Sequence, residues 1–425
     1  MHTFITVAEG YSGLWGKVCS CFLLTFFILT TCAVSTGAAY EEPPVLQAES
    51  ILKPELLKSK NHSVQAQVIN DGLFNHYTVE SGFGTFKAVS TNDLKILVRE
   101  IDAIAAMKLV KTDDTAIASL KQSGENVATG VQSLFNDPQA TLEGAASGVG
   151  GLFNRARGTV GKREITDAES SQFEQLVGIS KSKGVIATKY GVNVYSRNKV
   201  LQEELDRLGQ ADFFGGLGVG AATSFVPGVG GVVLSTSGAA RLLNEAINTT
   251  PASELWLQNK SKLVGMGIND DTVELFLNNP SFSPALSTVL VAALESLKGV
   301  DNRELFIKVA LQAGDPVMAK VITKIAVMSA GYNKEIAPLT SFTLLARITQ
   351  ALRKDGTRVV LLPADQIIWN KRIAEMAMSV KSEAKESNLE LWVLGSLSKQ
   401  ATVELQKQGW KIHTDSGPQL LPDRK

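Results

Sequence analysis

The sequence predicts a mainly α-helical protein. It consists of a helical bundle-like block with a glycine-rich apolar helical hairpin, a small N-terminal β-hairpin and a small C-terminal α/β module. Two observations predict it. Between residues 249 and 353, helix-capping residues, prolines at first helical positions and glycines after helix ends agree with apolar residues at helical spacing. After residue 355, β-branched runs alternate with amphipathic segments. At 425 residues, the chain is long enough for two or three domains.

The first 39 residues predict a signal peptide. Residues 18–34 form an uncharged apolar run, and small residues follow it as far as Ala39. We therefore expect cleavage after Ala39 and a periplasmic or extracellular mature protein. Two alternatives stay open. Residues 18–40 are long enough to anchor an uncleaved chain in the inner membrane. Cys32 offers a lipidation site, although the residues before it suit a lipoprotein signal poorly.

Charge and cysteine usage exclude several classes of function. Lys and Arg together number 42, as do Asp and Glu, so no excess of positive charge favours nucleic acid as a partner. Cys19, Cys21 and Cys32 are the only cysteines, and all of them lie in the predicted signal peptide. The mature chain is therefore expected to have neither disulfides nor a thiolate metal site.

Residues 40–122 are predicted to form a hairpin-helix N-terminal region. Residues 40–70 look polar and irregular. Alternating apolar residues then flank a turn at residues 81–84, which predicts a β-hairpin. Ser90 and Asp93 match a capping box that opens an amphipathic helix. We interpret this unit as structural.

Residues 123–163 are rich in glycine and alanine. Their thin, interrupted apolar face favours a flexible linker, with an amphipathic segment lying on a membrane as the alternative. Residues 164–354 then form the predicted α-helical domain. Helices within it are expected to start at Thr250-Pro251, Asn269, Ser283-Pro284 and Asp315-Pro316, the last of these ending at Gly331. A final helix is expected over residues 339–353.

Residues 213–240, inside that domain, carry no charged residue and form the predicted apolar hairpin. Small residues recur every fourth position, a spacing that lets two helices approach closely. A Phe-Val-Pro-Gly sequence breaks the segment into two arms, each too short to cross a bilayer. The hairpin either packs in the protein's own core or contacts a membrane or partner. Its candidate contact residues are Gly216, Gly220, Ser224, Phe225, Pro227 and Gly228.

A phosphate-binding interpretation of this hairpin is rejected. Residues 216–221 match the dinucleotide pattern of spaced glycines. That mechanism requires a preceding strand, an uninterrupted following helix and an acidic residue about 20 positions later. A charged helix precedes the glycines instead, and Pro227 follows too soon. We expect no nucleotide cofactor.

Residues 355–425 predict a β-α-β-α-β module with a parallel sheet. Ligands of such sheets bind beyond the C-terminal ends of the strands, where this chain has Asp365 and Ser398. A loop there could hold an anion, but the favoured interpretation of Ser398 is an ordinary helix N-cap.

No catalytic or metal-binding set stands out. The histidines of the mature chain, His62, His76 and His413, lie far apart and in no ligand spacing. We therefore expect no metal and no cofactor. Catalytic residues cannot be named, which favours a protein that is not an enzyme.

Residues 77–86 before an amphipathic helix, residues 190–198 before the glycine-rich segment, and Gly409-Trp410 together resemble exported proteobacterial proteins of no known activity. The resemblance implies no functional residues. The leading hypothesis is a non-enzymatic exported envelope protein that binds a partner or a membrane surface through residues 213–240. The alternatives are a hydrolase or ligand-binding enzyme with its site in the C-terminal module, and a scaffold for another envelope protein.

Overall fold

The computed structural model divides the chain into residues 1–39 and 40–425 and describes only the second unit. Within it, residues 111–166, 214–237, 346–347, 385–386 and 422–425 lie outside the described residues. The predicted signal peptide and linker, most of the apolar hairpin and its six candidate contact residues therefore lie outside the described residues as well.

The N-terminal region is a five-stranded sheet rather than a single hairpin. Strand β4 pairs antiparallel with β5 on one side and with both β2 and β3 on the other, and β1 pairs with β3. The predicted hairpin is confirmed as β4 and β5, whereas the irregular lead predicted for residues 40–70 contains the other three strands. The strands are β1 (Val45–Gln47), β2 (His62–Val64), β3 (Gln67–Asn70), β4 (Asn75–Ser81) and β5 (Gly84–Val89), with short helices α1 (Ala48–Ile51) and α2 (Pro54–Leu57).

Helix α3 (Thr91–Lys108) covers one face of this sheet. Its predicted N-cap is confirmed, since the Ser90 hydroxyl accepts a hydrogen bond from the Asp93 N–H at 3.1 Å. Tyr77 and Val79 on β4 pack with Leu94 and Ile101 on α3 in one buried cluster. Alternating strand residues thus bury one face of the sheet against the apolar stripe of the helix.

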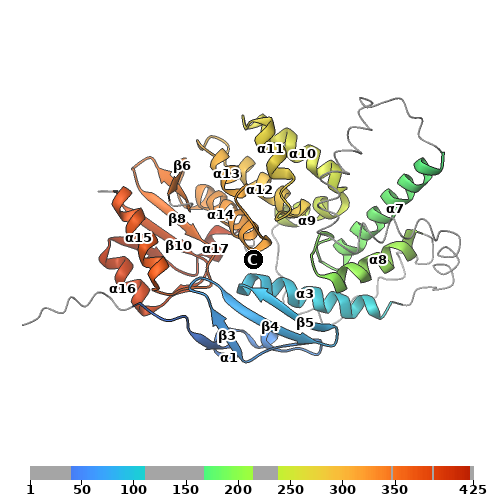
Figure 1. Ribbon diagram of the computed structural model, residues 1–425, viewed down its shortest axis with the longest axis horizontal. Helices are drawn as coiled ribbons and strands as arrows, with labels where there is room; N and C mark the ends of the chain where they lie inside the picture. The colour runs from blue at the N-terminus through green and yellow to red at the C-terminus, as the bar shows by residue number, and fades with distance from the viewer. Residues whose placement is uncertain (1–39, 111–166, 214–237, 346–347, 385–386, 422–425) are drawn as a thin grey trace, which may run out of the picture. The chain divides into compact units, whose positions relative to one another are not determined.

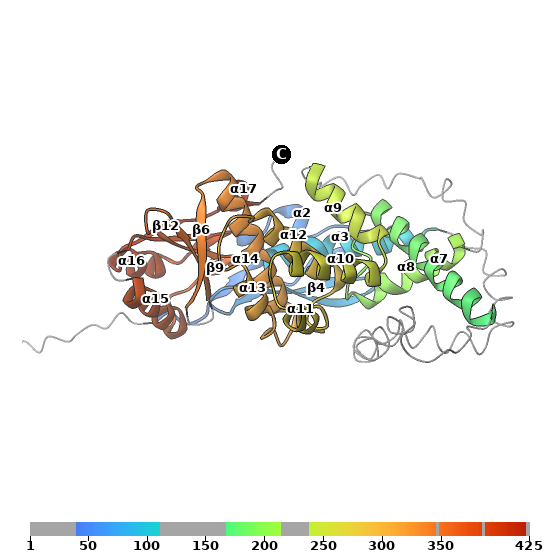
Figure 2. The same ribbon diagram turned by 90° about the horizontal axis from the view of Figure 1, so that it is seen from above.

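A series of helices fills the middle of the chain (Figure 2). Helices α7 and α8 lie side by side, joined by residues 190–198, and α9 packs on α7. The predicted helix starts at Pro251, Asn269, Ser283 and Asp315 are confirmed. The helices are α7 (Asp167–Lys189), α8 (Lys199–Phe213), α9 (Gly238–Thr249), α10 (Ala252–Gly265), α11 (Asp270–Leu277), α12 (Pro284–Ser296), α13 (Glu304–Ala310) and α14 (Pro316–Glu335).

The C-terminal part is a second five-stranded sheet, in the order β12-β10-β8-β7-β6. Strands β8, β10 and β12 are parallel, with α15 and α16 between them in the chain, which confirms the predicted β-α-β-α-β order. Figure 1 shows α15 and α16 beside this sheet. The elements are β6 (Leu339–Leu345), β7 (Ile348–Arg353), β8 (Arg358–Leu362), β9 (Gln366–Ile367), α15 (Lys371–Ala384), β10 (Leu389–Val393), β11 (Ser396–Leu397), α16 (Lys399–Lys407), β12 (Trp410–His413) and α17 (Gly417–Leu420).

The helix predicted over residues 339–353 is wrong, because this stretch forms the antiparallel pair β6 and β7. Together with β1–β3, that pair also makes the predicted mainly α class wrong, since the described residues form two five-stranded sheets as well as helices. Strand β7 lies against β8 and extends the sheet. Pairing of β7 with a strand on each side outweighs the helix propensity of its Leu, Ala and Arg residues.

Two faces of the second sheet bury different clusters. Val359, Leu361 and Trp392 pack with the helical block, including Tyr332 on α14. Val360, Leu391 and Trp410 pack beneath α15 and α16. Among the residues that the structure describes, no helix is both long enough and apolar enough to cross a membrane.

Candidate functional site

Asp365 lies beyond β8, as predicted, but its carboxylate binds the protein's own backbone. It accepts hydrogen bonds from the Asn75 N–H at 3.0 Å and from the Thr91 N–H at 3.0 and 3.1 Å. Burial raises the pKa of Asp365 above its usual range, although these hydrogen bonds oppose the change. Asp365 therefore joins the C-terminal module to β4 and to the start of α3.

The Ser398 side chain likewise forms hydrogen bonds within the protein. Its hydroxyl oxygen accepts the Ala401 N–H at 3.0 Å, so it caps α16 as predicted. The same hydroxyl donates to the carboxylate of Glu41, which also accepts the Trp369 N–H at 2.8 Å. Leu73 also binds the loop after β8, because its carbonyl accepts hydrogen bonds from the Asp365 and Gln366 N–H groups. Thus the chain's own residues 41–75 lie where a ligand of a parallel sheet would bind.

The histidines are not brought together. His62 is buried, with Nε2 3.1 Å from the Leu56 carbonyl and Nδ1 2.8 Å from the Ser59 hydroxyl. His76 is exposed and pairs with Asp71 at 2.8 Å. His413 stacks on Trp392 with ring centroids 3.9 Å apart, and burial lowers its pKa. Over the described ranges, no three His, Cys, Asp or Glu side chains are grouped to hold a metal ion.

Glu390, which the sequence analysis missed, is a buried carboxylate on β10. Its Oε2 accepts from the Tyr332 hydroxyl and from the Trp392 indole N–H, each at 3.0 Å. Its Oε1 lies 3.3 Å from the Arg353 guanidinium. Because every partner is a donor, the buried charge is compensated and ties α14 to the second sheet. Only the alternation of side chains along β10 could have indicated this buried carboxylate, because it places Glu390 on the same face of the sheet as Trp392.

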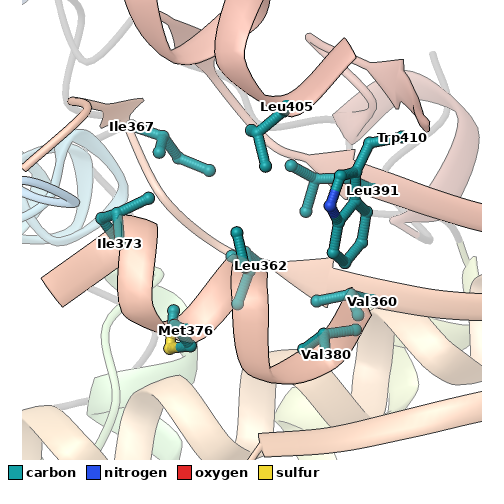
Figure 3. Close-up of a pocket in the computed structure, with 10 residues that line it drawn as sticks. Val360, Leu362, Ile367, Ile373, Met376, Val380, Leu391, Leu405 and Trp410 are labelled. Carbon is teal, nitrogen blue, oxygen red and sulfur yellow. The ribbon is translucent and has the colours of Figure 1, made fainter. Parts of the chain in front are cut away.

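A small apolar pocket lies between the second sheet and helices α15 and α16 (Figure 3). Its cavity volume is about 30 Å³, against the ~10–15 Å³ that one water requires. Its walls come from the sheet, from α15 and from α16. They include Val360, Leu391, Trp410, Ile373, Ala377 and Leu405.

One polar atom belongs to this pocket. Trp410 is 6% exposed, and its Nε1 has no hydrogen-bond partner. Figure 3 shows that nitrogen on the side of the ring that faces the other lining side chains. Leaving a buried N–H unpaired costs about 1–3 kcal/mol, so the arrangement needs an explanation.

Residues 190–198, between α7 and α8, connect several elements. Glu100 on α3 is 7% exposed and accepts hydrogen bonds from Ser196 at 2.5 Å and Asn198 at 3.1 Å. Burial raises the pKa of Glu100, which these hydrogen bonds oppose. Tyr195 donates to the Thr250 carbonyl at 2.8 Å, and Arg197 donates to the Pro280 carbonyl at 2.6 Å. This loop is a structural junction between α3 and the helical block.

The ends of α3 and α8 lie close together. Arg207 on α8 donates to the carbonyls of Met107 at 2.7 Å and Val110 at 3.2 Å, at the C-terminal end of α3. Phe213, the last residue of α8, is about 9 Å farther along that helix at 1.5 Å per residue. Helices α3 and α8 thus pack together, with Val110 following the first and Phe213 ending the second. Leu109, between Met107 and Val110, is 83% exposed.

Comparisons with family models, with curated proteins and with solved structures found no match for this chain.

Proposed function

We propose that this chain is a non-enzymatic exported envelope protein that binds a membrane surface or an envelope partner through residues 213–240. The observation that carries the proposal is the contact of Arg207 with Met107 and Val110. It joins α8, at whose last residue the uncharged segment 213–240 begins, to the end of α3.

Apolar side chains at these ends support the proposal. Leu109 is 83% exposed just after α3, and Phe213 is 38% exposed at the end of α8. Exposed apolar side chains beside an uncharged segment are a feature of surfaces that bind a membrane or another protein. The engagement of Asp365 and Ser398 in internal hydrogen bonds gives no support to catalysis at the C-terminal module.

Vesicle sedimentation tests the membrane part. We expect the chain spanning residues 40–425 to sediment with vesicles of phosphatidylethanolamine and phosphatidylglycerol. Phe225→Glu with Val229→Glu should abolish sedimentation, because burying a carboxylate among lipid chains is costly. A matched pair in the other segment, Leu142→Glu with Phe153→Glu, adds the same charge and should leave most of the binding. Unchanged circular dichroism would show that each variant is folded.

Two outcomes contradict the membrane proposal. The unaltered chain remains in the supernatant with vesicles, or the two double variants lose binding equally. The export part is tested separately, by N-terminal sequencing of the protein from the periplasm or medium. A mature chain that begins at Tyr40 supports cleavage after Ala39, whereas an intact N-terminus in the membrane fraction supports the anchor formed by residues 18–40.

A further inference from the structure

We infer that the pocket beneath α15 and α16 binds a small neutral aliphatic molecule that carries one hydrogen-bond acceptor and no donor, such as a short ketone, ether or ester. This inference is independent of membrane binding, because it concerns only described residues of the C-terminal module. It rests on the lining of the pocket and on the unpaired indole N–H of Trp410.

The lining selects against charge. The side chains that form the pocket are all aliphatic, thioether or indole, and no ionised group is among them. An ammonium or carboxylate would therefore lose its hydration without gaining a partner. The ligand group that enters is consequently neutral and largely hydrocarbon.

The indole of Trp410 selects for an acceptor. Indole offers one N–H and no acceptor, so it matches a single oxygen lone pair. A hydroxyl group in this position would accept from Nε1 but would leave its own proton unpaired. A carbonyl or ether oxygen leaves nothing unpaired. The end of a lipid acyl chain has no oxygen, and it would leave the Trp410 N–H unsatisfied.

The size of the cavity selects for a short group. At about 30 Å³, the cavity takes only a short chain of heavy atoms. Leu362 and Met376, which also line it, are only partly buried, so the pocket opens to the surface beside them. The flexible side chain of Met376 allows the opening to adapt to a slightly larger molecule.

Nuclear magnetic resonance of the chain spanning residues 40–425 tests the inference, with 2-butanone as the probe. The chain is labelled with ¹⁵N at the tryptophan indoles and ¹³C at the methionine methyl groups. We expect 2-butanone to shift the Trp410 indole signal and the Met376 methyl signal saturably, and to leave the Trp392 indole in place, because Trp392 already donates to Glu390. The matched alcohol 2-butanol should bind more weakly, and butylammonium should not bind.

Two variants separate the contributions. Ala377→Leu places three more carbon atoms in the pocket and should abolish the saturable shifts, whereas Met378→Leu, an exposed position on the same helix, should not. Trp410→Phe keeps an aromatic ring but removes the N–H. The affinity for 2-butanone, followed at Met376, should fall about fivefold, the equivalent of one buried hydrogen bond of about 1 kcal/mol.

Three results would overturn the inference. The first is a linear, unsaturable shift of all the indole signals, which describes a solvent effect. The second is equal binding of butylammonium or 2-butanol. The third is an unchanged affinity in Trp410→Phe or in Ala377→Leu, each with its Trp392 and Trp256 signals in place to show that it is folded.

Discussion

At the scale of single residues, this protein uses partly or fully buried carboxylates to join segments that are far apart in sequence. Asp365 binds the backbone of Asn75 and Thr91, and Glu100 binds Ser196 and Asn198. The sequence located Asp365 and Ser398 at the ends of parallel strands. It could not show that Glu41, Asn75 and Thr91 form hydrogen bonds with these two side chains, because such pairings depend on the packing of the whole chain.

Asp365→Asn should destabilise the fold by about 1–2 kcal/mol, because in either orientation the amide nitrogen replaces an oxygen that accepts from the Thr91 N–H and sets two donors against each other. Urea unfolding followed by circular dichroism measures the change. The matched control is Asp71→Asn. Asp71 also accepts two backbone N–H groups, from Leu73 and Phe74, but its side chain is 44% exposed. Water can replace the hydrogen bonds of Asp71, so Asp71→Asn should lose less stability than Asp365→Asn. Equal losses would contradict the role of burial.

Glu100→Gln should change how stability depends on pH. Because burial raises the pKa of Glu100 above 4.5, its ordinary value, the folded state favours the neutral carboxyl group. The stability that this preference adds is fully present below the unfolded pKa and is lost as pH rises through the folded pKa. The variant is neutral at every pH. Its stability relative to the unaltered chain should therefore increase between about pH 4 and pH 7 in urea unfolding. A constant difference across this range would refute the prediction.

At the scale of elements, helix positions were predictable because capping residues and apolar spacing are local. Ser283 with Pro284 and Asp315 with Pro316 open α12 and α14 as predicted. The helix expected to end at Gly331 instead runs on to Glu335. Gly331 allows α17 to approach α14 closely, because a Cβ at this position would lie 1.8 Å from the Leu420 carbonyl oxygen of α17. The contact between α14 and α17 therefore explains the glycine, which the local sequence pattern had marked as a helix end.

Gly331→Ala should therefore push α17 away from α14 and lower stability by about 1–3 kcal/mol. Thermal unfolding gives the magnitude. The control is Gly265→Ala at the end of α10, where nothing lies within 4 Å of the added carbon. That substitution should be neutral or should stabilise the helix by up to about 1 kcal/mol. A Gly331→Ala chain as stable as the unaltered one would show that α17 is not held in this position.

At the scale of the whole molecule, the predicted mainly α class failed because β1–β3 and β6–β7 are held by tertiary pairing. Val45 on β1 pairs with Ile69 on β3 although β2 lies between them in the sequence, and Gln350 on β7 is fully buried in the second sheet. Short strands with weak alternation have no strong local signal. The parallel strands β8, β10 and β12 were predictable because each is a compact apolar run between helices.

Cutting the chain within residues 111–166 should not separate its two parts. The N-terminal piece stays attached through Asp365, through Glu100 and through the 2.6 Å ion pair between Asp93 and Lys320. With a protease site inserted in this segment, we expect the cut pieces to elute together in gel filtration and to separate only in denaturant. Separate elution in native buffer would contradict it.

The hydrogen bond between Ser398 and Glu41 spans 357 residues. Synthesis runs from the N-terminus, so residues 41–75 emerge from the ribosome long before the strands and loops that complete their pairing. The first sheet therefore lacks its partners on the second sheet until nearly the whole chain has been made. Such late closure delays the folded state. If the first 39 residues direct export, this delay keeps the chain extended enough to pass through a translocation channel before it folds.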